Sequence, residues 1–442
     1  MSDSFDLLIR SGTVATLKGI APADVGVRAG KIVAVGALGG AKAAHVFEAR
    51  GLHVLPGVID TQVHFREPGN THKEDLETGS RAAVLGGVTA VFEMPNTDPP
   101  TTSAAAIVDK LSRAKGRMHC DHAFYVGATP QNIGELAELE KMPGVAGVKA
   151  FLGSSTGTLL LDHEKDILAA LKSGHRRMAV HSEDEARLKA RKHLAQRGHV
   201  ETQPVWRDVE TATISTERVL RLAREAKRKL HVLHVTTAEE LPLLKAEREF
   251  ATCEVTPQHL TLAAPECYER LGTFAQMNPP IREARHRDAL WNAVREGLFD
   301  VVGSDHAPHT RAEKDKTYPD TPSGMPGVQT LVTILLDHVN AGRMTLERFV
   351  ELTSSGAARI FGISGKGGIA EGYDADFTIV DLKARRKIEN KWIASRCGWT
   401  PFEGLETTGW PVATIIRGRI VMREGALLAP GFGEPIHFFD TT

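Results

Sequence analysis

The chain has 442 residues and a formal net charge of −1, from 54 lysines and arginines against 55 aspartates and glutamates. Hydrophobic residues make up 42% and charged residues 25%, a composition that is typical of a folded globular protein and excludes a chain disordered throughout. The balanced charge gives no electrostatic reason to expect nucleic acid or an anionic membrane surface as a partner.

The N-terminus and the cysteines predict a cytoplasmic protein. The first six residues carry two acids and no basic segment, so we expect no signal peptide. No apolar run approaches the roughly 18 residues that a membrane helix needs. The four cysteines are scattered and form no CxxC pair, which favours a reducing compartment.

Both ends of the chain alternate short apolar runs with glycine turns, which predicts small β-hairpins. We assign residues 1–53 and 368–442 to one small composite β-sandwich domain, although the sequence does not establish that the two ends pair. The strand-like runs are residues 5–9, 26–28, 31–35, 376–380 and 414–421, the last folding back around Arg417-Gly418.

The middle of the chain, residues 54–367, alternates short apolar runs with longer amphipathic stretches such as residues 217–224. This rhythm predicts a parallel α/β sheet, and its length of about 300 residues fits a (β/α)₈ TIM-like barrel. A doubly wound sheet is the competing fold, but no GxGxxG turn follows an early strand. The expected strands include residues 54–60, 88–92, 148–152, 178–181, 231–234 and 301–305.

Six polar residues fall in or just after these expected strands, where barrel enzymes carry their chemistry. Imidazole and carboxylate groups converging there would suit Zn²⁺ or a similar ion. A single histidine at a strand end is more often packed or hydrogen-bonded than a ligand, and Lys149 has the alternative of pointing outward at a strand edge. The six are Asp60, His64, Lys149, His181, His234 and Asp305.

An ordered set of motifs along nearly the whole chain resembles the amidohydrolase superfamily, and within it the dihydroorotase family. Each motif is weak alone, but their order is specific. The resemblance implies a distorted barrel with a small β-domain and one or two divalent ions, usually zinc. The motifs are residues 60–69, 73–75, 86–89, 94–97, 147–149, 181–183, 231–234, 277–282, 303–309, 324–327 and 367–376.

The resemblance also implies roles for single residues. Lys149 would take up CO₂ to become a carbamate and bridge the two metal positions. His181 and His234 would complete one position, while His64 and Asp305 would serve the other. Asp305 would also be the general base and then the general acid.

One position departs from the family pattern Asp-x-His-x-His, because Gln62 replaces the first histidine. An amide oxygen is a poorer zinc ligand than imidazole. Three outcomes remain open: one metal on Lys149, His181 and His234; weak or water-mediated coordination by Gln62; or a non-catalytic relative.

Arg66 bears on the substrate, because a planar guanidinium suits a carboxylate and dihydroorotate carries one. Hydantoin and dihydropyrimidine rings lack it. The alternative is a surface ion pair of Arg66 with Glu67 or Asp75. Residues 153–157 suggest either a mobile loop over the site or a plain polar turn. The further substrate-binding candidates are Asn96, Asn278, Arg282 and His309.

The resulting interpretation is a metal-dependent cyclic amidase that interconverts dihydroorotate and N-carbamoyl-aspartate in pyrimidine synthesis. One alternative is a hydantoinase, dihydropyrimidinase or allantoinase. Another is a silent dihydroorotase-like subunit that scaffolds aspartate transcarbamoylase. Besides its small-molecule substrate, we expect a homo-oligomer, either dimer or tetramer, with aspartate transcarbamoylase as a candidate partner.

Overall fold

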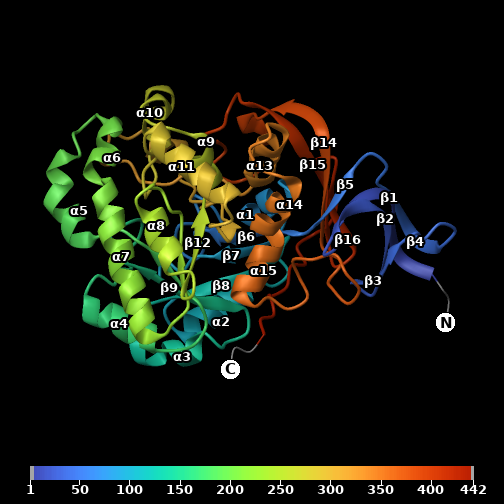
Figure 1. The fold of residues 1–442 in the computed structure, drawn as a ribbon, viewed down its shortest axis with the longest axis horizontal. Helices are drawn as coiled ribbons and strands as arrows, with labels where there is room; N and C mark the ends of the chain where they lie inside the picture. The colour runs from blue at the N-terminus through green and yellow to red at the C-terminus, as the bar shows by residue number, and fades with distance from the viewer. Residues whose placement is uncertain (1–3, 440–442) are drawn as a thin grey trace.

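Eight parallel strands from the middle of the chain form a barrel in the computed structural model, which describes residues 4–439 (Figure 1). Each strand lies beside its neighbour in the sequence, and a bridge between Val63 and His306 joins the first edge to the last. The predicted barrel is confirmed. Its strands are β6 (Val58–Val63), β7 (Val88–Glu93), β8 (Asp121–Gly127), β9 (Val145–Phe151), β10 (Met178–His181), β11 (Leu230–Val232), β12 (Ala251–Val255) and β13 (Val301–Val302).

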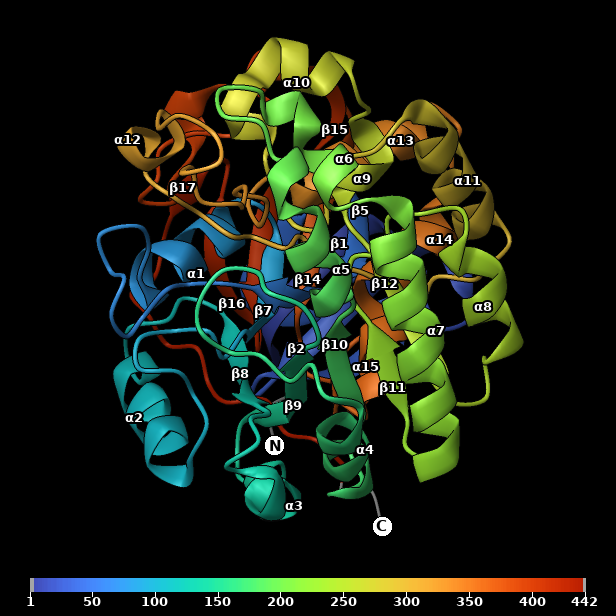
Figure 2. The same cartoon turned by 90° about the vertical axis from the view of Figure 1, so that its left-hand side faces the viewer.

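Helices cover the outside of the barrel, as Figure 2 shows. The longest, α7 (Val209–Ala226), includes the predicted helical stretch 217–224 and begins where the Asp208 side chain accepts a hydrogen bond from the amide of Thr211. Its buried face includes Val219 and Leu222, which pack against the barrel core. Within residues 4–439, none of the helices is both long and apolar enough to cross a bilayer.

The other helices differ widely in length, and several are single turns between a strand and the next loop. They are α1 (Leu76–Leu85), α2 (Ala104–Ala114), α3 (Leu136–Leu139), α4 (Glu164–Lys172), α5 (Glu185–Arg191), α6 (Gln203–Trp206), α8 (Glu240–Ala246), α9 (Pro257–Thr261), α10 (Glu266–Leu271), α11 (Ala284–Arg295), α12 (Arg311–Lys314), α13 (Leu331–Asn340), α14 (Leu346–Val350) and α15 (Gly356–Phe361).

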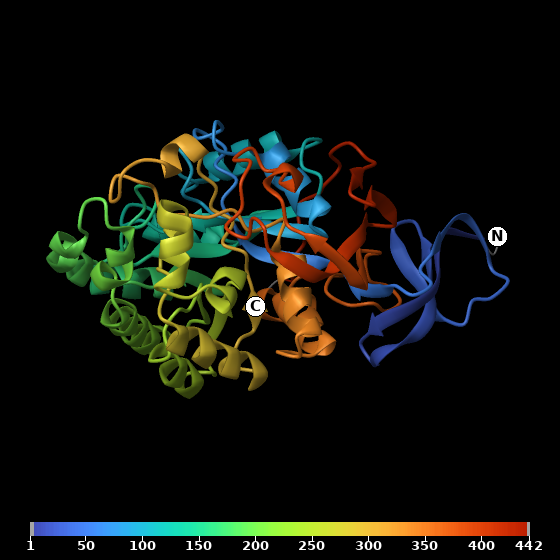
Figure 3. The ribbon, with the colours of Figure 1, turned by 90° about the horizontal axis from the view of Figure 1, so that it is seen from above.

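The two ends of the chain pair in one nine-stranded sheet beside the barrel (Figures 1 and 3). The joint lies where β5 from the N-terminal part runs antiparallel to β14 from the C-terminal part. The turn predicted at Arg417-Gly418 is present, with both residues at positive φ. The strands are β1 (Ser4–Thr16), β2 (Gly19–Arg28), β3 (Lys31–Gly36), β4 (Lys42–Glu48), β5 (His53–Pro56), β14 (Phe377–Lys387), β15 (Glu406–Ile416), β16 (Arg419–Arg423) and β17 (Ala426–Leu427).

Part of the predicted C-terminal domain packs against the barrel rather than within the small sheet. The indole of Trp399 donates to the carbonyl of His309 at 2.8 Å, and Pro435 forms a bridge with His122 at the start of β8. Trp399 and Phe402 are buried in an apolar cluster with Met277 and Met325. These apolar side chains draw their segments onto the barrel because burial removes them from water.

Candidate active site

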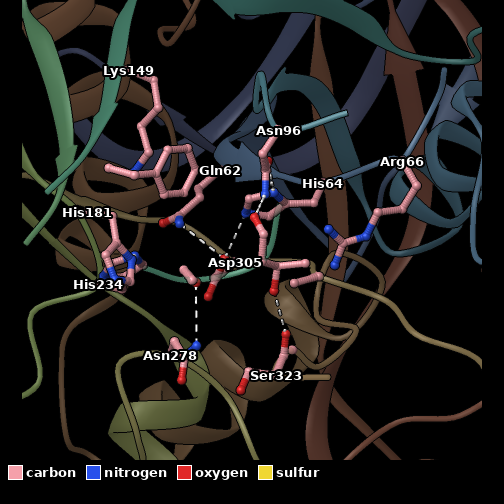
Figure 4. A pocket seen from close by; sticks show the side chains of 15 residues that line it. Gln62, His64, Arg66, Asn96, Lys149, His181, His234, Asn278, Asp305 and Ser323 are labelled. Atoms are coloured by element: carbon pink, nitrogen blue, oxygen red, sulfur yellow. Dashed lines mark hydrogen bonds and ion pairs between the residues drawn. The ribbon is translucent and has the colours of Figure 1, made fainter. Parts of the chain in front are cut away.

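The polar residues at the strand ends converge on one cavity at the carboxyl ends of the barrel strands (Figure 4). They come from strands that are far apart in the sequence, as expected for a barrel site. Asp60 does not line the cavity. The predicted residues that do are His64, Arg66, Asn96, Lys149, His181, His234, Asn278 and Asp305.

Three of these residues have left-handed backbone conformations. The φ angles of Arg66, His234 and Asp305 are 64°, 37° and 44°, although none is glycine. Such conformations cost free energy and persist where the surrounding structure enforces them, which happens often at functional sites. The three residues with strained backbone all line the cavity, so the backbone conformations and the side-chain chemistry indicate the same functional site.

His64 presents an unprotonated nitrogen to a carboxylate. Its Nδ1 lies 2.7 Å from Oδ1 of Asn96, whose own amide nitrogen donates to the carbonyl of Thr156. Asn96 thus accepts from Nδ1–H, and the lone pair on Nε2 faces Oδ1 of Asp305 at 3.2 Å. Burial lowers the pKa of His64, which favours this neutral form. Two electron-rich atoms at this separation could both bind one cation, as neighbouring ligands of a tetrahedral ion do.

The second histidine pair contains one acceptor nitrogen whose tautomer is fixed by a carboxylate. His181 donates from Nε2 to Glu183 at 2.8 Å, so its Nδ1 carries the lone pair and faces Nε2 of His234 at 3.1 Å. Nδ1 of His234 is buried without a hydrogen-bond partner. A carboxylate behind a histidine that fixes its tautomer is the usual arrangement for metal-binding imidazoles.

Lys149 is buried in the lining of the same cavity, and only 1% of its surface is exposed. The alternative of an outward-pointing side chain is therefore wrong. Its Nζ has no hydrogen-bond partner in the structure and lies 4.5 Å from the ring centre of Phe151. Burial lowers the pKa of Lys149 to about 7, against the opposing effect of Asp305 and Glu254. A large share of this amine is thus neutral near pH 7 and able to react.

The donor chemistry fits a divalent ion, provided that Lys149 contributes. Within residues 4–439, no three His, Cys, Asp or Glu side chains are grouped as a metal site by themselves. The candidate ligands instead fall into two pairs, His181 with His234 and His64 with Asp305. An anionic oxygen on Lys149 would add a third ligand to each pair, and the Nζ that would carry it lines the same cavity without a hydrogen-bond partner.

The side chain of Gln62 forms a hydrogen bond with Asp305. Its Nε2 donates to Oδ1 of Asp305 at 3.1 Å, while its Oε1 is buried with no hydrogen-bond partner. The amide therefore helps to hold the carboxylate and keeps an unused oxygen in the cavity. This oxygen is neutral and binds Zn²⁺ more weakly than imidazole does.

We expect Gln62→His to raise the zinc bound per chain after mild chelation, because imidazole strengthens the His64 side of the site. In the unaltered protein the ion on that side should be lost before the ion held by His181 and His234. Elemental analysis during stepwise dialysis against a chelator measures both effects. Gln131→His, which adds a histidine at an exposed position, controls for adventitious zinc. Two tightly held ions in the unaltered protein, with no gain in Gln62→His, would contradict this.

Arg66 enters the cavity from the loop after β6, with 3% of its surface exposed. Its Nε donates to the carbonyl of Pro308, and Nη2 lies 3.3 Å from Nε2 of His309. Glu67 pairs instead with Arg117, so the alternative of a surface ion pair with Glu67 is wrong. His309 lies behind Arg66 and does not line the cavity.

The other substrate-binding candidates differ in their placement. Asn278 lines the cavity, and its Nδ2 lies 3.5 Å from Ser155. Both polar atoms of Asn96 are already engaged, by His64 and Thr156. The structure does not bring Arg282 to the cavity: its Nε donates to Thr236 and its Nη1 to a backbone carbonyl.

Within residues 153–157, Ser155 and Thr156 line the cavity, and hydrogen bonds hold the segment at Ser154 and Thr156. The amide of Ser154 donates to Glu185 at 2.6 Å, and its carbonyl accepts from Arg207 at 2.7 Å. The hydroxyl of Thr156 donates to the carbonyl of Ser323. Of the two earlier interpretations, a segment packed over the site fits this placement, while its mobility stays a prediction.

Sequence reasoning did not recognise the pair of Glu183 and Arg207. Glu183 is fully buried; burial would raise its pKa, but Arg207 and His181 outweigh this and hold it at about 2. Arg207 thus links the orientation of His181 to the carbonyl of Ser154 over the cavity. The sequence feature that could have indicated this pair is Glu183, an acidic residue two positions after the strand-end histidine His181.

A model of the amidohydrolase family matches residues 53–421. The dihydroorotase of Methanothermobacter thermautotrophicus is 37% identical over 410 residues, which cover 92% of each chain. The allantoinase of Rubrobacter xylanophilus is also 37% identical, over 98% of this chain and 97% of its own. Among solved structures, the L-hydantoinase (dihydropyrimidinase) from Arthrobacter aurescens superposes with a TM-score of 0.93 at 30% identity, covering 98% of this chain and 99% of that one.

Proposed function

The chain belongs to the amidohydrolase family, and on that premise we propose that it is a dihydroorotase, an enzyme that opens dihydroorotate to N-carbamoyl-aspartate and closes it again. The single observation that carries the choice of substrate is Arg66, a buried guanidinium inside the cavity with no carboxylate partner of its own among residues 4–439. A buried cation without a counterion is costly unless a bound anion pairs with it. Dihydroorotate supplies that anion.

Members of this family generally depend on a bound metal ion, and this supports the proposal of a metal-dependent enzyme. His181 and His234 would hold one ion, and His64 and Asp305 would hold another more weakly, with a carbamate on Lys149 supplying an anionic oxygen ligand. The neutral amine of Lys149 adds to CO₂ and loses a proton, which converts a buried amine into a carbamate with anionic oxygens. A divalent ion, in our proposal Zn²⁺, would lower the pKa of the attacking water and polarise the scissile carbonyl.

Asp305 performs the proton transfers in this account. Its Oδ1 is held by the amide of Gln62 and faces His64, while the side chain opens into the cavity (Figure 4). The carboxylate takes a proton from the water that attacks the ring carbonyl. It then gives the proton to the ring nitrogen that leaves as the C–N bond breaks, so the carboxylate is regenerated.

Two other functions remain as alternatives to be tested. The allantoinase and hydantoinase relatives show that this fold serves uncharged rings as well. Arg66 favours the charged ring over these. A silent scaffold subunit would have no need for the buried set of Lys149, His181, His234 and Asp305.

Changing Arg66 to lysine should lower kcat/KM for dihydroorotate at least about tenfold, mainly through KM. Lysine keeps the charge but loses the two-point contact with a carboxylate, and a charged hydrogen bond is worth about 1.5–3 kcal/mol. Both residues have a Cβ, so the left-handed backbone strain at this position is equal. Steady-state kinetics in both directions of the reaction measure the effect.

Arg113→Lys serves as the control, because Arg113 is exposed and pairs with Asp109 on helix α2. We expect its kinetics to match the unaltered protein. An unchanged kcat/KM in Arg66→Lys would place the guanidinium outside substrate recognition and remove the main support for dihydroorotate.

The proposal also concerns the compartment of the protein and its assembly. The four cysteines are free and buried, as expected in a reducing cytoplasm. Assembly as a homodimer or homotetramer, and association with aspartate transcarbamoylase, stay predictions.

A further inference from the structure

His309 lies between two cationic side chains that compete for its ring nitrogens. Nζ of Lys73 is 3.2 Å from Nδ1, and Nη2 of Arg66 is 3.3 Å from Nε2. The carbonyl of Ser323 lies 3.1 Å from Nε2 as well. The ring is fully buried, so these three groups, together with the Glu313 carboxylate 4.0 Å from Nδ1, decide which nitrogen carries the proton.

A neutral imidazole has one N–H and one acceptor nitrogen, whereas ammonium and guanidinium groups only donate. Burial, followed by Arg66, Lys73 and Lys314, holds the pKa of His309 well below its usual range, so the ring is neutral. It can accept from Lys73 or from Arg66, but not from both. The carbonyl of Ser323 requires a proton on Nε2, and this agrees with Lys73 as the donor to Nδ1.

We propose that Lys73 is a positioning residue for substrate specificity, which holds His309 in the Nε2–H tautomer and so keeps Nη2 of Arg66 free for a substrate carboxylate. In this tautomer Nε2 is a donor and cannot accept from Arg66. The guanidinium is anchored by Nε on Pro308, and its terminal nitrogens remain available in the cavity. The inference rests on the proposed function, since it names how that site selects an acidic ring.

The contacts around Lys73 hold it in this role. Its Nζ forms an ion pair with Glu313 at 3.1 Å, and Glu313 is itself fixed by a capping box with Thr310 at the start of α12. The backbone of His309 is held from the other side by the indole of Trp399. These contacts keep the ring next to Lys73. The property of the ring that can still change is therefore its tautomer, that is, which nitrogen carries the proton.

Without Lys73, the opposite tautomer becomes accessible. A proton on Nδ1 would leave Nε2 as the acceptor, and Nη2 of Arg66 would then donate to it. That bond would compete with the substrate carboxylate for Arg66. The contacts of Asp305 and Lys149, which we propose to take part in the chemistry, would be unaltered.

The test uses Lys73→Met, which keeps the length of the side chain and removes the donor. We expect KM for dihydroorotate and Kd for orotate to rise about tenfold, as for the loss of one charged hydrogen bond, while kcat changes less than about threefold. Binding of the neutral carboxamide of orotate should not weaken. Lys316→Met, at an exposed lysine nearby, is the control and should behave as the unaltered protein.

A second variant separates the tautomer from simple loss of charge. In a His309→Gln background the ring is absent, so Lys73→Met should there weaken orotate binding by less than about threefold. Equal losses in both backgrounds, or no loss in either, would overturn the inference. If the unaltered protein does not turn over dihydroorotate but Lys73→Met still weakens orotate binding selectively, the proposed function fails and the inference stands.

Discussion

Replacing Lys149 with alanine is expected to lower turnover by about 10³-fold or more, the factor that corresponds to several kcal/mol of lost transition-state stabilisation. The variant loses the oxygen that we propose for both metal positions. Folding should not suffer, because Nζ makes no hydrogen bond and its burial is unfavourable to the charged amine. Turnover, bound metal and the thermal unfolding midpoint are measured on the same preparation.

Short carboxylic acids such as acetate, added to Lys149→Ala, should restore part of the activity by supplying an oxygen ligand in the vacated space. Lys165→Ala, at an exposed lysine on α4, should change neither turnover nor metal content. Near-normal turnover in Lys149→Ala would remove this lysine from the mechanism.

Asp305→Asn should lower kcat by about 10²–10⁴-fold in both directions, the usual contribution of a general acid–base group. Asparagine has the same size and keeps an oxygen that can accept from Gln62, so the local packing should persist. It cannot take a proton from water at neutral pH. We expect KM to change far less than kcat, because Arg66 and the rest of the cavity are unaltered.

Asp315→Asn, at an exposed position just after α12, is the matched control. Circular dichroism and metal analysis should show that Asp305→Asn is folded and still holds the ion at His181 and His234. A folded, metal-loaded Asp305→Asn protein with unaltered kcat would assign the proton transfers to another group.

The strand ends were predictable because hydrophobic runs and polar residues follow a simple order along the chain. His181 and His234 each follow an apolar run, and both lie at the cavity. Strands β8 and β12 were not among the runs picked out. In β12, Thr252 and Glu254 interrupt the apolar run, whereas in β8 the apolar residues 123–126 come only after Asp121 and His122.

Contacts between distant side chains were beyond the sequence. Gln62 and Asp305 are 243 positions apart, and Lys73 and His309 are 236 apart. Spacing says nothing about whether such pairs touch. Gln62 was therefore judged only as a weak ligand, whereas the structure gives it a hydrogen bond to Asp305.

The placement of Arg282 shows a different limit. It follows a motif segment whose Asn278 does line the cavity, which suggested a substrate contact. Between them the chain turns, and the guanidinium is directed to Thr236 and to backbone carbonyls instead. Proximity in sequence to a site residue does not fix the direction of a long side chain.

The central claim is tested most directly by turnover of the unaltered, metal-loaded protein on a panel of cyclic ureides. Dihydroorotate, hydantoin, dihydrouracil and allantoin are compared by kcat/KM under the same conditions. We predict that dihydroorotate is preferred by at least about 10²-fold, because only its carboxylate forms paired charged hydrogen bonds with Arg66. Activity confined to the uncharged rings would contradict the account and assign the site to a hydantoinase or allantoinase reaction.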